Sequence, residues 1–225
     1  MMEKQILTIK KIEKVTHNVL RFTLTDTDAI KFLPGQAAEI AIDKEGWRKR
    51  ARPFTFTSLP MEDYLEFTIK IYPDHGAVTE ELSKLEVGDS LILKDIYGAI
   101  QYKGIGTFIA GGAGVTPFIS IIRDLNHKGE LEGNRLIFAN SKEEDIINKE
   151  EFESILGKDF LNILSREEVE PYAHGRIDVD YLKDNITSLD DYFYICGPEK
   201  MMDTVEEGLK ELGVKDDKII KEVFD

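Results

Sequence analysis

The first part of the chain carries short runs in which apolar and polar residues alternate. From Gln5 to about Lys94 these runs include QILTIKKI, VLRFTLT, AAEIAI, LEFTIKI and SLILKDI, and they are separated by Gly, Pro and Asp residues, which favour turns. Alternation with a period of two indicates strands with one buried face. Half a dozen such strands predict a small antiparallel β-barrel.

The pattern changes after Gly104. Apolar runs, GTFIA, RLIFA, LNIL and YFYIC, then alternate with stretches of helical periodicity that begin near Pro117, Glu150 and Glu199. Strands alternating with helices predict an α/β domain with a doubly wound parallel sheet. The glycine-rich segment IYGAIQYKGIG lies between the two patterns, and 225 residues suffice for two cores. We therefore predict two domains, residues 1–102 and 103–225.

Charge and composition exclude several functional classes. A formal net charge of -14 argues against a general nucleic-acid binder, which needs clustered Lys and Arg residues. The single cysteine, Cys196, excludes an intramolecular disulfide and an iron–sulfur cluster held by four cysteines. The four histidines are scattered, so we predict no metal site. Since no apolar stretch has the length of a signal peptide or a membrane span, we expect a soluble, cytoplasmic protein.

The segment GGAGVTPF follows an apolar strand and opens a predicted helix. Its glycines, Gly111, Gly112 and Gly114, would let the backbone approach a pyrophosphate, and Pro117 suits the first helical position. The spacing is not the GxGxxG of the usual dinucleotide fingerprint. A tight turn without a ligand therefore stays an equal alternative at this point.

Five short motifs occur in a fixed order along the chain: Arg52-Pro53-Phe54-Thr55, Gly76-Ala77-Val78-Thr79, GGAGVTPF, Cys196-Gly197-Pro198 and Glu222-Val223-Phe224. In this order they resemble the ferredoxin–NADP reductase superfamily. The stretches FTIKIYPDHGAVTEEL, IFANSKEEDIINKEEF and CGPEKM are particularly similar to cytochrome b5 reductases and to the reductase part of flavohaemoglobins.

The resemblance implies a barrel that binds FAD, followed by a nicotinamide-binding domain. It implies an NAD(P)H-dependent flavoprotein oxidoreductase, in which a hydride passes from NADH or NADPH to bound FAD. Electrons then pass to a separate acceptor such as a ferredoxin, a flavodoxin or a haem protein. Two alternatives stay open, a reductase of free flavin and a non-catalytic electron-transfer subunit of a larger complex.

The resemblance also assigns the flavin residues. In Arg52-Pro53-Phe54-Thr55, the arginine would contact the FAD pyrophosphate, Phe54 would stack on the flavin in place of the usual tyrosine, and Thr55 would lie near flavin N5. The segment Gly76, Ala77, Val78 and Thr79 would bind phosphate, and Lys70 and Tyr72 would reach the phosphate and ribityl region. Without the resemblance, the first run is an ordinary strand, Thr79 a helix N-cap, and Lys70 and Tyr72 solvated strand residues.

The nicotinamide residues follow in the same way. The pyrophosphate would lie on Gly111, Gly112, Gly114, Thr116 and Pro117, and the thiol of Cys196, with Gly197 and Pro198, would position the nicotinamide. Phe224 would cover the flavin, and Glu222 would supply a polar contact. Thr55, Cys196 and Glu222 are thus the predicted catalytic residues. The alternatives are a small buried cysteine and a final buried strand.

Two further predictions concern partners. Asp145 would favour the free 2′-hydroxyl of NADH over the phosphate of NADPH, although Ser141 and Lys142 could hold that phosphate. The basic run Trp47-Arg48-Lys49-Arg50 stands out in an acidic chain. Its Arg48, Lys49 and Arg50 would dock an acidic electron carrier, or the run is only a solvated loop.

Overall fold

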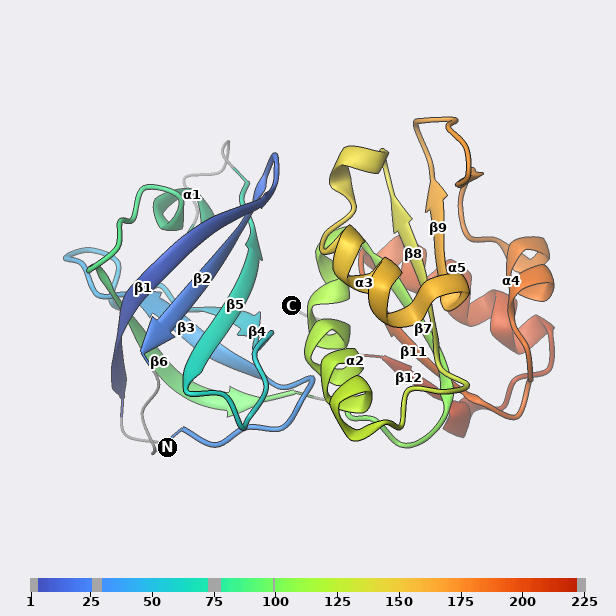
Figure 1. Cartoon of the computed structure of the whole chain (residues 1–225), viewed down its shortest axis with the longest axis horizontal. Coiled ribbons are helices and arrows are strands. Elements are labelled where there is room, and N and C mark those ends of the chain that lie inside the picture. The colour runs from blue at the N-terminus through green and yellow to red at the C-terminus, as the bar shows by residue number, and fades with distance from the viewer. Residues whose placement is uncertain (1–3, 26–29, 73–77, 99, 222–225) are drawn as a thin grey trace. The chain divides into compact units, whose positions relative to one another are not determined.

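The computed structural model describes residues 4–25, 30–72, 78–98 and 100–221 (Figure 1). The chain forms two compact units, which are treated separately below. The first comprises Met1–Gln101 and Thr116–Asp124, and the second comprises Tyr102–Val115 and Leu125–Asp225. The units follow the change of pattern along the sequence, except that the first part of one helix groups with the barrel. The predicted domain limits, 1–102 and 103–225, stay a prediction.

The first unit contains a six-stranded antiparallel sheet with the strand order β4-β3-β6-β1-β2-β5. The strands at the two ends of this order meet through a bridge between Phe56 and Phe67, which closes the sheet into the predicted barrel. The strands are β1 (Gln5–Thr16), β2 (Val19–Thr25), β3 (Ala37–Ile42), β4 (Arg52–Thr55), β5 (Tyr64–Lys70) and β6 (Ser90–Tyr97), and the helix of this region is α1 (Val78–Leu82).

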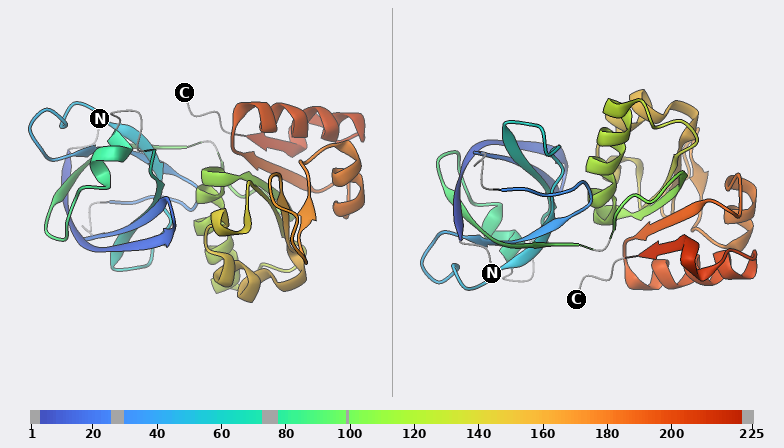
Figure 2. Two further views of the ribbon diagram at one scale, coloured as in Figure 1. Left: turned by 90° about the horizontal axis from the view of Figure 1, so that it is seen from above. Right: turned by 90° about the horizontal axis from the view of Figure 1, so that it is seen from below.

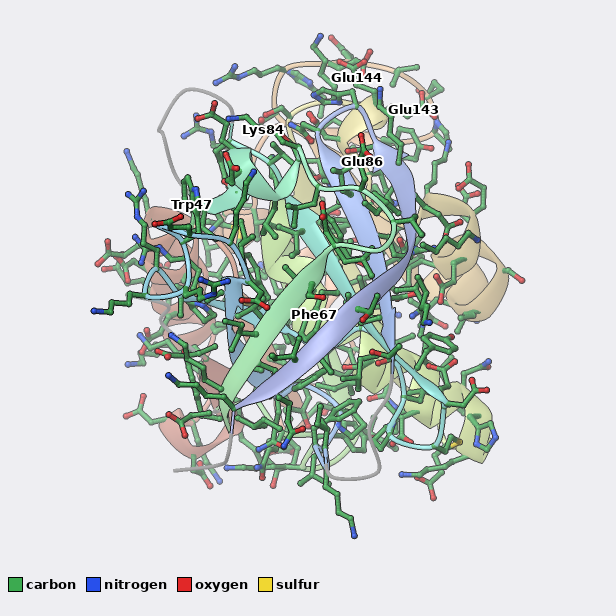
Figure 3. All side chains as sticks on the ribbon, turned by 90° about the vertical axis from the view of Figure 1, so that its left-hand side faces the viewer. Trp47, Phe67, Lys84, Glu86, Glu143 and Glu144 are labelled. Carbon is green, nitrogen blue, oxygen red and sulfur yellow. The ribbon has the colours of Figure 1, made fainter. Side chains whose placement is uncertain are left out.

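Alternation along the strands builds the barrel core. On β1, Leu7 and Ile9 are fully buried, Thr8 between them is half-buried, and Ile6 and Lys10 on either side are exposed. Phe67 on β5, labelled in Figure 3, is fully buried and belongs to the core of the first unit. The start of β1 thus buries one face, as a period of two requires, whereas β3 and β5 are buried on both faces along most of their length.

The second unit contains a six-stranded sheet with the order β10-β9-β8-β7-β11-β12, and every strand pair in it is parallel. The predicted doubly wound α/β domain is therefore confirmed. The strands are β7 (Gly106–Gly111), β8 (Arg135–Asn140), β9 (Phe160–Leu164), β10 (Ala173–His174), β11 (Tyr192–Cys196) and β12 (Ile219–Lys221). The α-helices are α2 (Thr116–Lys128), α3 (Lys149–Leu156), α4 (Val179–Asn185) and α5 (Glu199–Glu211), and short 3-10 turns are η1 (Gly112–Val115), η2 (Glu143–Asp145), η3 (Gly157–Asp159) and η4 (Asp216–Lys218).

Helices cover both faces of the parallel sheet. Leu182 of α4 and Val205 of α5 pack into one core cluster with Ile137 of β8. Helix α3 lies on the opposite face, where the rings of Phe152 and Phe160 are 5.4 Å apart, and the two layers are visible in Figure 2. The carboxyl ends of β7, β8, β9 and β11 consequently meet at one edge of the sheet, where ligands of such folds bind.

We find no helix in the described part of the chain that combines the length and apolar character of a membrane span.

Candidate functional site

Strand β4 carries the first predicted flavin motif. In the described residues it pairs along its length with β3 alone, and its other edge, here called the open edge, makes no strand pairing until Phe56 bridges to Phe67 of β5. Arg52 begins the strand and is exposed, and its guanidinium donates to the carbonyl of Ala51 at 3.2 Å. The structure shows no carboxylate partner for Arg52 within the described ranges, so its guanidinium is available to bind an anionic ligand.

The register of β4 separates its next two side chains. Phe54 pairs with Ala38 and packs, half-buried, against the barrel core. Thr55 pairs with Ala37 and is 5% exposed. Adjacent strand residues point to opposite faces, so the two side chains do not share a face. A ligand at the open edge of β4 could still contact both.

The structure brings together three residues of the predicted phosphate region. The backbone N–H of Tyr72 donates to the hydroxyl of Thr79 at 3.4 Å, and the Lys70 ammonium lies 6.0 Å from the ring centre of Tyr72. Burial raises the pKa of Tyr72, which therefore stays a neutral hydrogen-bonding group at neutral pH. Lys70 has no carboxylate partner in the described chain. Val78 is buried and begins α1, whereas Gly76 and Ala77 lie outside the described residues.

The two nicotinamide motifs meet backbone to backbone. Cys196 pairs in register with Ala110, at the end of adjacent strands β11 and β7. A Cβ added to Gly114 would lie 2.3 Å from the carbonyl oxygen of Cys196, and one added to Gly111 would lie 2.6 Å from Met201 Sδ. One added to Gly197, whose φ is +159°, would lie 3.0 Å from the N of Gly111. Glycine is thus required at these three positions, because the two motifs approach each other too closely for a Cβ atom.

Helix α2 begins directly after the glycine turn. Its N-cap residue, Val115, has no side chain that could satisfy the first N–H groups, and Pro117 occupies the first turn. Thr116 is half-buried and its hydroxyl lies at this helix start. The positive end of a helix dipole is favourable for a phosphate. The glycine turn and the start of α2 are adjacent, and the assignment of Gly111, Gly112, Gly114, Thr116 and Pro117 to a pyrophosphate stays a prediction.

The acidic loop after β8 is largely neutralised from within. The carboxylate of Asp145 accepts the backbone N–H of Lys142 at 3.0 Å, and Glu144 pairs with the ammonium of Lys142 at 3.4 Å. The carboxylate of Glu143 accepts hydrogen bonds from Lys149 and Tyr172. Both lower the pKa of Glu143, and the hydrogen bond from Lys149 has the larger effect. Ion pairs of this kind reduce the repulsion that the loop would exert on a phosphate.

Two residues at this sheet edge were not predicted from the sequence. Ser165 and Arg166 follow β9, and their backbone N–H groups donate to the carbonyls of Asn140 and Ser141, both at 2.9 Å. Arg166 is exposed, and the described residues provide no partner for its guanidinium. The sequence did contain a pattern that could have indicated Ser165 and Arg166, because both are polar residues that directly follow an apolar strand.

The basic loop between β3 and β4 is ordered by its own contacts. Arg48 pairs with Asp43 at 2.5 Å, and the guanidinium of Arg50 lies 4.7 Å above the ring of Trp47, which is labelled in Figure 3. Lys49 is exposed and has no partner among the described residues. Lys49 and Arg50 therefore keep their charge available, whereas Arg48 is partly neutralised.

Four predicted residues lie in parts of the chain that the structure does not describe. Glu222 and Phe224 lie outside the described residues, as do Gly76 and Ala77. Within the ranges that the structure describes, there is no group of three or more His, Cys, Asp or Glu side chains that could hold a metal ion.

Comparison with known proteins identifies both halves of the chain. Residues 6–102 match the family model described as "Oxidoreductase FAD-binding domain", and residues 108–207 match "Oxidoreductase NAD-binding domain". NADH-cytochrome b5 reductase 1 of Aspergillus oryzae is 30% identical over 234 residues, which cover 94% of this chain and 80% of the relative. NADH-cytochrome b5 reductase 2 of Homo sapiens is 27% identical, over 92% of this chain and 90% of the relative.

Solved structures share the fold over its whole length. The FAD/NAD-binding domain of nitric oxide dioxygenase from Vibrio cholerae aligns with a TM-score of 0.87 at 22% identity, covering 98% of each chain. Flavohemoglobin from Malassezia yamatoensis, with bound FAD and heme, aligns with a TM-score of 0.85 at 23% identity and covers all of this chain and 61% of that one. The chain therefore belongs to the ferredoxin–NADP reductase-like family of flavoprotein oxidoreductases and is an FAD-dependent NAD(P)H oxidoreductase.

Proposed function

We propose that the barrel holds FAD along the open edge of β4, with Arg52 on its pyrophosphate and Thr55 beside the reactive ring. The observation that carries this assignment is the position of Arg52 and Lys70. Both are cations without a carboxylate partner in the described part of a strongly acidic chain. Unpaired cations next to backbone and hydroxyl donors fit a pyrophosphate. Bound FAD supplies a two-electron acceptor that can release electrons singly.

Replacing Arg52 with Gln should weaken FAD binding about 10- to 100-fold, because a charge-assisted and bidentate contact becomes a neutral one. Titration of FAD-free protein, followed by flavin absorbance, measures the change. Arg176→Gln is the matched control, since Arg176 is also exposed but lies in the other unit. Equal affinities for the two variants would remove Arg52 from the site. Wild-type protein that leaves gel filtration without FAD would instead support a reductase of free flavin.

For the nucleotide, we propose NADH as the preferred donor, with Asp145 near the adenosine ribose. The carboxylates of residues 143–145 disfavour a 2′-phosphate, although their partners weaken the effect. NADPH is the second candidate, because the exposed Arg166 lies beside Ser141 at the same sheet edge. The guanidinium of Arg166 and the hydroxyls of Ser141 and Ser165 would together suit a phosphate.

Steady-state kinetics with both nucleotides decide between these candidates. We expect a higher kcat/KM with NADH, and Asp145→Asn should reduce that preference by up to about tenfold, since one carboxylate opposes the phosphate charge. If NADH is the preferred donor, Arg166→Gln should leave kcat/KM for NADH unchanged. If the wild type prefers NADPH and Arg166→Gln removes about 10- to 100-fold of that preference, Arg166 holds the phosphate and the NADH assignment is wrong.

For the acceptor, we propose an acidic electron-carrier protein that docks on the basic loop. The relatives from Aspergillus oryzae and Homo sapiens are named as reductases of cytochrome b5, which makes this haem protein a suitable probe. Lys49 and Arg50 would supply most of the attraction, because Arg48 is already paired with Asp43.

Reduction of cytochrome b5 should slow steeply as salt rises, since screening acts within about 10 Å at 0.1 M ionic strength. Changing Arg48, Lys49 and Arg50 to Gln should reproduce the high-salt rate, while reduction of a small neutral quinone stays constant. The control changes Lys10, Lys11 and Lys14 on β1, which removes the same charge from exposed residues of another strand. Equal loss with both triple variants would assign the effect to net charge and not to docking.

A further inference from the structure

A buried group of charged and hydroxyl side chains lies inside the first unit, next to the flavin strand. Glu66 of β5 is 6% exposed, and its carboxylate accepts from the hydroxyl of Thr57 at 2.7 Å and from Nη1 of Arg123 at 2.8 Å. The hydroxyl of Thr57 lies 3.2 Å from that of Thr68, and Nε of Arg21 lies 3.6 Å from the other carboxylate oxygen. We call these five residues the Glu66 cluster.

The Glu66 cluster holds the peptide of Thr57 by both its side chain and its backbone. Nη1 of Arg123 donates to the carbonyl of Thr57 at 2.7 Å, in addition to its bond with Glu66. The N–H of Thr57 donates to the carbonyl of Glu66 at 2.8 Å, and the N–H of Glu66 donates to the hydroxyl of Ser58 at 3.0 Å. The chain segment that leaves β4 is therefore fixed at several points.

Stability alone is a poor explanation for such a cluster. A buried ion pair gains little over apolar side chains of the same volume, because both charges lose their hydration. It does impose a defined geometry, since the guanidinium fork meets its acceptors in fixed directions. Strand β4 needs such a constraint, because its described residues pair with only one neighbouring strand.

Arg123 also connects this segment to helix α2, whose residues Thr116–Asp124 belong to the same unit as the barrel. A second attachment lies one turn earlier, where the N–H of Gly35 donates to the hydroxyl of Ser120 at 3.0 Å. A Cβ on Gly35 would lie 2.3 Å from the carbonyl oxygen of Ile100, so the backbone is closely packed here. Helix α2 is thus attached to the segment that directly follows β4 and to the loop before β3.

We propose that the Glu66–Arg123 pair is a positioning element that sets the conformation of β4 at Thr55 by attaching the segment after β4 to helix α2. This inference rests on the proposed role of β4 in flavin binding. Neither residue contacts the reacting atoms, and their effect passes through Thr57. Loss of the pair lets the open strand shift, and displacements of about 1 Å at a reacting group can cost about 100-fold in rate.

The test compares Glu66→Gln, Arg123→Met and the double variant in FAD-loaded protein. Each single change should slow flavin reduction by NADH about tenfold in stopped-flow experiments, with the NADH dissociation constant unchanged. It should also alter the visible circular dichroism of bound FAD. In FAD-free protein, the amide of Thr57 should exchange its hydrogen faster. The double variant should be no slower than either single one, because the pair acts as a unit.

Asp159→Asn serves as the control, because it breaks an ion pair at 2.9 Å in the other unit with Arg135, whose side chain is about as enclosed as that of Arg123. If Glu66→Gln lowers the melting temperature as this control does but leaves the reduction rate, the dichroism and the Thr57 exchange unchanged, the proposal is overturned. Thr57→Val and Arg123→Lys repeat the test if the first variants do not fold. Thr55→Val tests the proposed function separately: if it leaves reduction unchanged, the role of Thr55 fails, whatever the Glu66 variants show.

Discussion

Replacing Gly114 with Ala should raise the dissociation constant for NADH at least tenfold and destabilise the protein by about 1 to 3 kcal/mol. The added Cβ would lie 2.3 Å from the carbonyl oxygen of Cys196 and 2.6 Å from the Cα of Gly197. All of these neighbours are backbone atoms, so the clash cannot be relieved by a side-chain rotation. The turn and the Cys196-Gly197-Pro198 segment must move apart, and both belong to the proposed nicotinamide site. Fluorescence-monitored titration and thermal unfolding measure the two effects.

Gly106→Ala provides a matched comparison for this prediction. Gly106 lies on the same strand pair, β7 and β11, but at its amino end, where an added Cβ would meet the carbonyl oxygen of Tyr192 at 2.0 Å. We expect a similar loss of stability and an unchanged dissociation constant for NADH. Equal weakening of nucleotide binding by both variants would mean that Gly114 acts only through the stability of the sheet.

The sequence predicts the fold well where periodicity is long and regular. Alternating runs such as QILTIKKI and LEFTIKI became β1 and β5, and apolar runs such as YFYIC became central strands of the parallel sheet. Closure of the barrel through Phe56 and Phe67 could not be predicted, because it depends on a single bridge between distant residues. Helix α4 was not predicted either, since VDYLKDN is too short for a helical period to be recognised.

In the candidate site, too, features formed by consecutive residues could be predicted, and contacts between distant residues could not. Motifs on consecutive residues, such as GGAGVTPF and Cys196-Gly197-Pro198, were placed correctly at the carboxyl edge of the sheet. Only the folded structure shows that the glycines of these motifs pack against one another and do not merely leave room for a ligand. The Glu66 cluster joins residues that are 57 positions apart in the sequence. Its charged members give a local signal only as charges within apolar runs, which are Arg21 in VLRFTLT, Glu66 in LEFTI and Arg123 in FISIIRDL.

Charge predictions were the least complete, because a sequence does not show which charges neutralise one another. The basic run at residues 47–50 reads as three equal cations, yet Arg48 is paired with Asp43 and Arg50 lies over Trp47. The acidic run at residues 143–145 reads as three free carboxylates, yet each has a partner. The proposed docking surface and the proposed nucleotide preference therefore both depend on which charges the folded chain leaves without a counter-charge.

Cys196 is the residue for which a structural and a functional explanation differ most in their consequences. Its side chain is 1% exposed, which agrees with a small buried residue that only fills space. Its backbone, however, ends β11 at the sheet edge, next to the glycine turn that we assign to the nucleotide. A buried thiol at this edge can restrict how the nicotinamide ring lies without forming any covalent bond with it.

Cys196→Ala should therefore leave FAD bound and slow flavin reduction by NADH about five- to 150-fold, which corresponds to roughly 1 to 3 kcal/mol of transition-state stabilisation. Cys196→Ser should lose less, because its hydroxyl keeps a polar atom of similar size in the same place. Stopped-flow reduction at saturating NADH measures the rate, and the flavin absorbance of the same samples confirms that FAD is loaded. A purely structural thiol would lower the melting temperature in both variants and leave the reduction rate as in the wild type. Because Cys196 belongs to the second unit whereas Arg52 and Thr55 belong to the first, loss of FAD from Cys196→Ala would contradict the proposed division of roles between the two units.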